Sequence, residues 1–278
     1  MSATTNFSDS AAQSRHLLAA PPEVSCRRSW GPHHELESTL QALDAALVAE
    51  PGSADLLFLR ASSLQMLGRE AESRIAYVQA LQRDPDHLGA LCNLGRSLLA
   101  NRNHAAAHLV LERAVCKHPG DLASHVALGI ALYQMRQPAK ALATLERAVQ
   151  IAPYSAPAHA AMAFVLEALG RCERAKIHRR KGFHNRSLIG LPYRGEHAPV
   201  RVLLLASTNG ANAPLVRFLD DRTFQTWVVV PEFHDPKTAL PPHELVVNAI
   251  GDADAAPAAL SSAHALLARV LAPVVNLP

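Results

Sequence analysis

The stretch LGALCNLGRSLLANRNHAAAHLVLERAVCKHP, residues 88–119, contains a pattern of small, large and proline residues that returns in the next segment of the chain. The first copy of the pattern consists of Gly95, Ala107, Leu111, Ala114 and Pro119, and the second consists of Gly129, Ala141, Leu145, Ala148 and Pro153. Every member of the second copy follows its counterpart at the same interval. Repetition at a fixed period of roughly 20–50 residues is the signature of a stacked repeat architecture.

Prolines and small residues extend the same period over the first two thirds of the chain. The prolines are evenly spaced and each opens a short turn: Pro51, Pro85, Pro119 and Pro153. Small residues recur in three columns: Ala61, Gly95, Gly129 and Ala163; Ser73, Ala107, Ala141 and Ala175; and Ala80, Ala114, Ala148 and Gly182. Proline ends a helix, and only Ala, Gly or Ser fits where two helices cross closely. Each period therefore predicts an antiparallel helix pair that buries its apolar face against neighbouring pairs.

This series of positions resembles the tetratricopeptide repeat, and the resemblance covers residues 36–186. It implies an α-solenoid, a superhelix of antiparallel helix pairs, with a degenerate repeat at 36–53 and full repeats at 54–87, 88–121, 122–155 and 156–186. The sequence departs from the family's pattern in two ways: the aromatic position is occupied by Leu111 and Leu145 in two repeats, and the usual tryptophan near the start of each first helix is absent. Residues 1–35 are expected to form a partly disordered N-terminal segment.

In this family the first helices of the pairs line a concave groove that receives a peptide or a helix. The resemblance implies that the following residues face the groove: Phe58, Ser62, Gln65, Asn93, Arg96, Leu99, Val126, Ile130, Tyr133, Phe164 and Glu167. Members that hold a ligand's terminal carboxylate use several Lys, Arg and Asn residues, of which Asn93 and Arg96 remain here, so such a clamp is not expected. Two occupants of this mostly apolar groove stay open, an apolar or helical segment of a partner and the chain's own residues 1–30.

The pattern changes after residues 187–199, whose glycines and prolines predict an interdomain linker. Apolar runs of the kind found in buried parallel strands follow, at Val200–Ala206, Phe224–Val230, Glu244–Ile250 and Ala272–Asn276. Helices are expected between them, at Ala213–Asp220 and Ala255–Val270. This alternation predicts a small α/β domain of Rossmann type at 200–278.

The loops that follow the predicted strands contain candidate ligand-binding residues. Asn209 and Gly210 come after the first strand, and Asn248 and Asp252 come at the end of the third, at the edge where α/β sheets bind ligands. The loop 207–214 has a single glycine, so it lacks the Gly-x-Gly-x-x-Gly and phosphate-loop patterns. A carboxylate at Asp252 fits a helix N-cap as well as a ligand site.

The runs ELVVNAIGDAD at 244–254 and APVVNLP at 272–278 resemble the small α/β domain that precedes the catalytic domain in ATP-grasp ligases. In that family the ATP-binding lysines, metal carboxylates and glycine-rich loop lie further downstream, beyond Pro278. A second likeness is to repeat-fused glycosyltransferases. Their sugar-nucleotide domain would also require a longer chain than the residues that follow the repeats.

Composition narrows the function classes. A formal net charge of +3 over 278 residues gives no reason to expect nucleic-acid binding, and the basic stretch Arg171–Arg186 is interpreted as a solvated capping helix. His104 and His108 are one helical turn apart but lack a third metal ligand. The four cysteines are widely spaced, and neither a secretory signal nor a membrane-spanning apolar run is found, so a cytoplasmic protein without membrane contact is expected.

The sequence therefore predicts a scaffold or adaptor that binds a protein or peptide partner, with no catalytic residues, no cofactor and no metal. The alternative is a truncated or regulatory form of a repeat-fused ATP-grasp-like ligase that lacks the ATP-binding domain. Nothing follows the last predicted strand to cover its edge, which favours self-association through the C-terminal domain.

Overall fold

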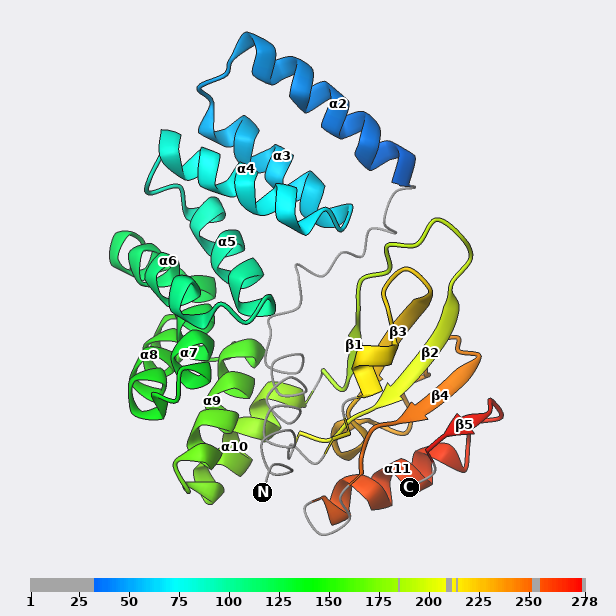
Figure 1. Ribbon diagram of the computed structural model, residues 1–278. Coiled ribbons are helices and arrows are strands. Elements are labelled where there is room, and N and C mark those ends of the chain that lie inside the picture. The colour runs from blue at the N-terminus through cyan, green and yellow to red at the C-terminus, as the bar shows by residue number, and fades with distance from the viewer. Residues whose placement is uncertain (1–32, 185, 209–211, 214, 252–255, 277–278) are drawn as a thin grey trace, which may run out of the picture. The chain divides into compact units, whose positions relative to one another are not determined.

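The computed structural model describes residues 33–184, 186–208, 212–213, 215–251 and 256–276 (Figure 1). These residues belong to two compact bodies that meet in the sequence at Pro153 and Tyr154. We call them the N-terminal body (residues 33–153) and the C-terminal body (residues 154–276). Predictions for residues 1–32, including a groove filled by residues 1–30, lie outside the described residues.

The N-terminal body is a run of helices in which each helix contacts the next. The helices are α2 (His33–Ala49), α3 (Ala54–Met66), α4 (Glu70–Arg83), α5 (Leu88–Ala100), α6 (His104–Lys117), α7 (Leu122–Gln134) and α8 (Pro138–Ile151) (Figure 1). The helix predicted at Leu36–Glu50 is α2, and each of the periodic prolines follows the end of a helix, as predicted.

Side-chain caps explain why several of these helices begin where they do. Ser53, Asn103 and Asp121 each accept a hydrogen bond from the backbone N–H three residues later, at 3.3, 3.3 and 2.7 Å. Such a cap satisfies one of the amide groups that a helix start leaves without a partner.

The predicted small-residue positions lie where two helices cross. A Cβ atom added at Gly95 would lie 2.5 Å from Leu111, and one added at Gly129 would lie 2.6 Å from Leu145. The two glycines are separated by the same interval as the two leucines, so the repeated sequence produces the same contact twice. Ala61 and Ala163, which share this column, are fully buried.

A left-handed turn joins the two helices of each full repeat at the same position. Four residues in these turns have positive φ angles: Gly68 (75°), Arg102 (60°), Arg136 (60°) and Gly170 (71°). Their spacing along the chain equals the spacing of the periodic prolines. In the first of these turns, Gly68 N–H donates to Gln65 O at 3.0 Å and Arg69 N–H to Leu64 O at 2.9 Å. This pair of bonds satisfies carbonyls that the helix end leaves open. The sequence analysis did not single out this column.

The C-terminal body contains a helix pair followed by a mixed sheet. The helices are α9 (Ala156–Ala168), α10 (Cys172–Phe183) and α11 (Pro257–Leu267), with short 3₁₀ turns η1 (Leu215–Phe218) and η2 (Pro231–Phe233). The strands are β1 (Leu188–Gly190), β2 (Val200–Leu205), β3 (Phe224–Val229), β4 (Leu245–Asn248) and β5 (Val274–Val275). Their order across the sheet is β1-β3-β2-β4-β5.

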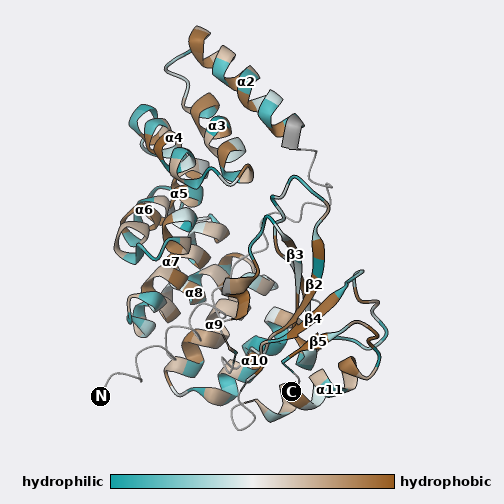
Figure 2. Ribbon diagram, turned by 45° about the vertical axis from the view of Figure 1, so that its right-hand side comes forward, coloured by the Kyte–Doolittle hydropathy of each residue, from teal (hydrophilic) through white to brown (hydrophobic). Residues whose placement is uncertain are grey.

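Strands β3, β2, β4 and β5 are parallel, and β1 runs antiparallel to β3 at the edge. The central strands are buried on both faces, which agrees with their hydrophobic colouring in Figure 2. The four predicted strands are therefore present, and β5 lies at the other edge, as expected for the last of them.

Two local predictions differ from the structure. The segment predicted as a linker, residues 187–199, contains β1, because Ile189 is buried and its neighbours pair with β3. The helix expected at Ala213–Asp220 is the single 3₁₀ turn η1. Phe183 at the end of α10 stacks on Phe233 of η2, with ring centroids 5.8 Å apart, so the end of α10 contacts the turn that follows β3. The predicted domain boundaries are not decided by these contacts and stay a prediction.

Candidate protein-interaction surface

Three of the predicted groove residues meet at one hydroxyl group, that of Tyr77 in α4. Its oxygen lies 3.1 Å from Ser62 Oγ, donates to Gln65 Oε1 at 2.8 Å and accepts from Asn93 Nδ2 at 3.0 Å. Tyr77 is fully buried, and burial raises its pKa. The hydroxyl thus joins α3, α4 and α5 and fixes the orientation of three side chains that sequence analysis assigned to the surface.

Phe58, another predicted groove residue, belongs to α3, and its half-buried ring lies against the start of α5. Its ring centroid is 6.0 Å from that of Tyr77 and 4.8 Å from that of His87. A Cβ atom at Gly89 would lie 2.8 Å from the Phe58 ring. Gly89 therefore allows the aromatic ring to approach the backbone of the next repeat.

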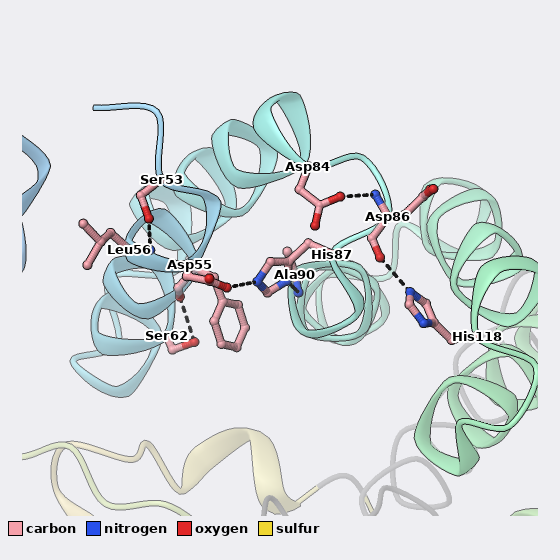
Figure 3. A network of polar contacts seen from close by, with 10 residues as sticks. Ser53, Asp55, Leu56, Ser62, Asp84, Asp86, His87, Ala90 and His118 are labelled. Carbon is pink, nitrogen blue, oxygen red and sulfur yellow. Dashed lines mark hydrogen bonds and ion pairs between the residues drawn. The ribbon is translucent and has the colours of Figure 1, made fainter. Parts of the chain in front are cut away.

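The loops between repeats are connected by histidines, as Figure 3 shows. His87 caps α5 by accepting the Ala90 N–H at Nδ1, at 3.1 Å, and this bond leaves the ring proton on Nε2. Nε2 lies 3.1 Å from Asp55 Oδ1 at the start of α3. His118 Nε2 likewise lies 2.6 Å from the carbonyl of Asp86. Each connection ties one repeat to the next and so fixes the spacing of the first helices.

Along α5 and α7 the predicted groove residues divide into two groups. Leu99, Val126 and Ile130 are 4%, 1% and 6% exposed, so they fill the interior. Arg96 and Tyr133 are partly exposed. The accessible part of the predicted surface in the N-terminal body is thus formed by α3, α5 and Tyr133.

The two predicted groove residues of the C-terminal body are held by internal contacts. Phe164 is buried. Glu167 Oε2 lies 3.0 Å from Arg179 Nη2 in a largely buried ion pair between α9 and α10. On the same helices, His159 Nδ1 lies 2.9 Å from His178 Nδ1.

The basic residues near α10 are partly engaged within the protein. Arg179 belongs to the ion pair with Glu167, and Lys176 Nζ lies 2.8 Å from Glu173 Oε1. Arg186 is largely buried, and burial lowers its pKa to about 10. Arg179 and Lys176 of α10 are therefore each paired with a carboxylate of the C-terminal body, and Arg186 lies beyond the end of the helix.

The predicted ligand loop falls largely outside the described residues, which omit Asn209, Gly210 and Asp252. Asn248 is described and is fully buried. Its Nδ2 donates to Ile250 O at 3.2 Å and its Oδ1 accepts from Ile250 N at 3.1 Å. The amide group of Asn248 is therefore used to hold the backbone of the turn that follows β4.

Glu232 at the same edge of the sheet was missed by sequence analysis. Its Oε1 accepts from Thr208 N at 2.8 Å, from Thr208 Oγ1 at 2.9 Å and from Ser207 Oγ at 3.3 Å. The carboxylate follows β3 and holds the end of β2. The signal available in the sequence was an acidic residue directly after a predicted strand.

Cys92 in α5 is the half-buried thiol among the residues that the structure describes, and its surroundings keep it protonated. Cys92 Sγ lies 3.0 Å from Ser124 Oγ, and burial raises the pKa of the thiol to about 11. A thiol with this pKa stays protonated at neutral pH and is a poor nucleophile. Among the residues that the structure describes, no three His, Cys, Asp or Glu side chains gather in a way that could hold a metal ion.

Within the described ranges, no helix combines the length and the apolar character that crossing a membrane requires.

Residues 37–87 and 92–156 match the tetratricopeptide repeat family. This part of the chain, which contains most of α2 and α5 and all of α3, α4, α6, α7 and α8, therefore consists of tetratricopeptide repeats, and the prediction made from the constant period is confirmed here. No curated protein matches the chain. The predicted likeness of residues 200–278 to an ATP-grasp protein gains no support from these comparisons and stays a prediction.

Solved structures of MamA are similar in fold. The MamA RS-1 ArsTM double mutant is 22% identical, with a TM-score of 0.51, over 64% of this chain and 94% of that chain. MamA 41-end from Desulfovibrio magneticus RS-1 is 22% identical, with a TM-score of 0.50, over 64% of this chain and 95% of that chain. A crystal structure of MamA is 19% identical, with a TM-score of 0.50, over 54% of this chain and 88% of that chain. At these identities the similarity concerns the fold alone.

Proposed function

We propose that the tetratricopeptide repeats bind a segment of a partner polypeptide on the surface formed by α3, α5 and Tyr133. The observation that carries this proposal is the hydroxyl of Tyr77, which holds Ser62, Gln65 and Asn93 in place before any ligand arrives. Side chains that are already ordered lose little conformational entropy on binding. Aromatic and arginine side chains beside them, such as Phe58 and Arg96, are the types that contribute most to binding energy.

The same geometry favours an apolar or helical segment over a terminal carboxylate. Asn93, one of the two residues left from a carboxylate clamp, already donates to Tyr77. Phe58 and Tyr133 offer partly exposed aromatic rings instead. An amphipathic helix that places apolar residues in such a groove is a recurring mode of recognition.

Site-specific photo-crosslinking tests this proposal. A photoreactive residue at position 96, on α5, is expected to capture a partner from native lysate, whereas the same residue at Gln79, exposed on α4, is expected to capture none of it. Arg96→Glu and Tyr133→Ala are expected to lower recovery of that partner in a pull-down by roughly tenfold each. Equal crosslinking from positions 96 and 79, or unchanged recovery with both variants, would contradict the proposed surface.

The alternative function is that of a truncated or regulatory ATP-grasp-like protein. The parallel strands have the order β3-β2-β4-β5, in which the chain leaves β2 toward one side and returns to β4 on the other, as in doubly wound sheets that bind ligands at the carboxyl edge. A saturable ATP titration of the full chain would support this alternative, and no binding at millimolar ATP would remove it.

Cytoplasmic location and self-association also stay predictions. Fractionation of native cells tests the first. Sedimentation of the purified chain tests the second, with β5 at the sheet edge as the expected contact.

A further inference from the structure

A cavity of about 390 Å³ lies in the C-terminal body, at the edge of the sheet where β4 and β5 begin. It is formed by the loop before β4 and by the end of α11 with the loop before β5. Its lining consists of His234, Thr238, Ala239, Leu240, His243, Leu266, Arg269, Val270, Leu271 and Ala272. Cavities of this volume suit small molecules. This edge lies opposite the loops that sequence analysis proposed for a ligand.

One side of the cavity is basic. Three of its ten lining residues are His234, His243 and Arg269, and none of the ten is Asp or Glu. In the described residues, the side chain of Arg269 makes one hydrogen bond, from Nη1 to Pro236 O at 2.7 Å. A guanidinium group has five N–H donors, so it retains the capacity to bind both oxygens of a carboxylate.

The two histidines add hydrogen-bonding groups beside the guanidinium. His243 Nδ1 donates to Pro241 O at 2.8 Å, which leaves Nε2 as the second polar atom of that ring. Burial lowers the pKa of His234, and the charge of Arg269 adds to this effect. The charge of Arg269 therefore reaches the imidazole of His234, and its guanidinium is the arginine group among the lining residues.

The other side of the cavity is apolar. Leu240, Leu266, Val270 and Ala272 line it, and all four also pack against the hydrophobic core of the sheet. A ligand that entered would therefore meet a charged group at one end and hydrocarbon at the other. Inorganic anions satisfy the first requirement and not the second.

The loop on one side of the cavity is held in shape before a ligand binds. Asp235 Oδ1 accepts from Lys237 N at 2.9 Å, and Asp235 O accepts from Thr238 N at 2.9 Å. Pro236, Pro241 and Pro242 restrict the same loop. Because the loop is already held in one shape, it loses little conformational entropy when a ligand binds.

We propose that this cavity binds a small organic acid, with the carboxylate on Arg269 and an apolar body against Leu240, Leu266 and Val270. The site shares no residue with the interaction surface of the repeats, so an experiment can reject one proposal without affecting the other.

Titration of the full chain with benzoate, followed by two-dimensional NMR, tests the site. Benzoate is expected to shift amide resonances of residues 234–243 and 266–272 in a saturable way. Benzyl alcohol has the same apolar body without the charge, and inorganic phosphate has charge without the body, so each is expected to bind at least tenfold more weakly. Benzyl alcohol or phosphate binding as tightly as benzoate, or benzoate causing no saturable shifts in these residues, would overturn the proposal.

Arg269→Gln is expected to weaken benzoate binding roughly tenfold, because it replaces a charged donor pair by a neutral one. Lys237→Gln is the matched control, since it removes one positive charge from the loop before β4, at an exposed residue outside the lining. It is expected to leave the affinity within about twofold. Arg269→Lys restores the charge and is expected to recover part of the affinity, which separates loss of charge from loss of fold. Equal effects of Arg269→Gln and Lys237→Gln would overturn the assignment to Arg269.

Discussion

The hairpins α5–α6 and α7–α8 and the hairpin α9–α10 share one sequence period but are held together by different forces. The residue that packs against the small-residue column is Leu111 in the first and Leu145 in the second. In the third hairpin the corresponding position is Arg179, which forms an ion pair with Glu167. The period therefore determines where two helices meet, and the chemistry of the contact varies from one hairpin to the next.

A second polar pair strengthens this contrast. His159 and His178 contact each other between α9 and α10, at positions where the hairpin α5–α6 has Leu91 and Val110. The same hairpin belongs to the C-terminal body, where Phe183 at the end of α10 stacks on Phe233 of η2. Apolar contacts tolerate changes of shape, whereas buried polar pairs require their partners. We therefore expect α9–α10 to be the more sensitive hairpin.

The largest expected effect is that of separating the charges in α9–α10. Glu167→Gln should lower the free energy of unfolding of this hairpin by about 2–3 kcal/mol, because Arg179 would keep its charge in a largely buried place. Arg179 Nε is already buried without a hydrogen-bond partner in the described residues. The double replacement Glu167→Leu with Arg179→Leu should recover most of the loss.

Hydrogen exchange of the amides of α9 and α10 measures this difference. Glu173→Gln, which breaks an exposed pair with Lys176 on the same helix, is the control and should change nothing measurable. A double variant as unstable as the single one would mean that the ion pair is not what distinguishes this hairpin.

The next effect compares glycines in the two kinds of hairpin. A Cβ atom at Gly182 would lie 2.6 Å from the backbone nitrogen of Ala160, which cannot move aside. Gly182→Ala should therefore destabilise α9–α10 by about 2 kcal/mol. At Gly95 the neighbours are the side-chain atoms Cγ and Cδ2 of Leu111, both at 2.5 Å, which can move further than a backbone atom. Alanine also gains about 1 kcal/mol of helix propensity, so Gly95→Ala should cost less than about 1 kcal/mol.

Urea unfolding of the two variants provides the comparison. Gly120→Ala is the control, since nothing lies within 4 Å of the added atom. Equal losses at positions 182 and 95 would contradict the distinction between backbone and side-chain contacts.

A smaller effect is the dependence of the stability of α9–α10 on pH, through His178. Burial, with additional contributions from His159, Lys181 and Arg174, lowers the pKa of His178 to about 4 from its ordinary 6.5. The unfolded chain then binds a proton more readily than the folded one. Stability is fully present above about pH 6.5 and falls as the pH drops toward 4. Because the ring is only partly buried, we expect a loss of about 1 kcal/mol between pH 7 and pH 5.

Hydrogen exchange of α9 and α10 at the two pH values checks this loss, with exchange rates corrected for pH. His178→Gln should abolish the dependence, whereas His184→Gln, at an exposed position, should retain it. The same pH dependence in His178→Gln as in the original chain would assign the proton to another group.

The smallest effect tests what all the hairpins share, the left-handed turn. Arg136 has a φ of 60° where Gly68 and Gly170 have 75° and 71°. Arg136→Gly should stabilise the N-terminal body by about 0.5 kcal/mol, because relief of the strained conformation outweighs the greater freedom of the unfolded chain. Gly170→Ala should cost about 1 kcal/mol for the opposite reason. Thermal unfolding measures both, and a destabilised Arg136→Gly would show that the arginine side chain contributes contacts of its own.

Periodicity explains why the repeats were predicted so fully from the sequence. Gly95, Gly129 and the periodic prolines each act through local geometry, which one chain is enough to reveal. The parallel strands were predicted for a similar reason, since Val202–Leu205 is apolar without interruption. Strand β1 was missed because three residues in a Gly- and Pro-rich segment have no pattern of their own, and pairing with β3 alone makes them a strand.

The contacts within the predicted surface could not be derived from the sequence, because they join residues that are distant in the chain. The bonds of Tyr77 to Ser62 and Asn93 join α4 to α3 and α5, and no regular spacing in the sequence predicts them. Val126 and Ile130 occupy first-helix positions that the family uses for ligands, but they are buried. The cavity beside Arg269 was not foreseen, because it combines residues from two separate loops.

The recurring turn at Gly68, Arg102, Arg136 and Gly170 has a consequence for how such a gene can change. Each turn is closed by bonds within a few residues, so it needs nothing from the rest of the chain. An in-frame duplication or deletion of one whole period would leave every turn and every crossing intact, whereas one that is a single codon short would rotate all later contacts out of phase. The number of hairpins is therefore free to evolve in whole steps.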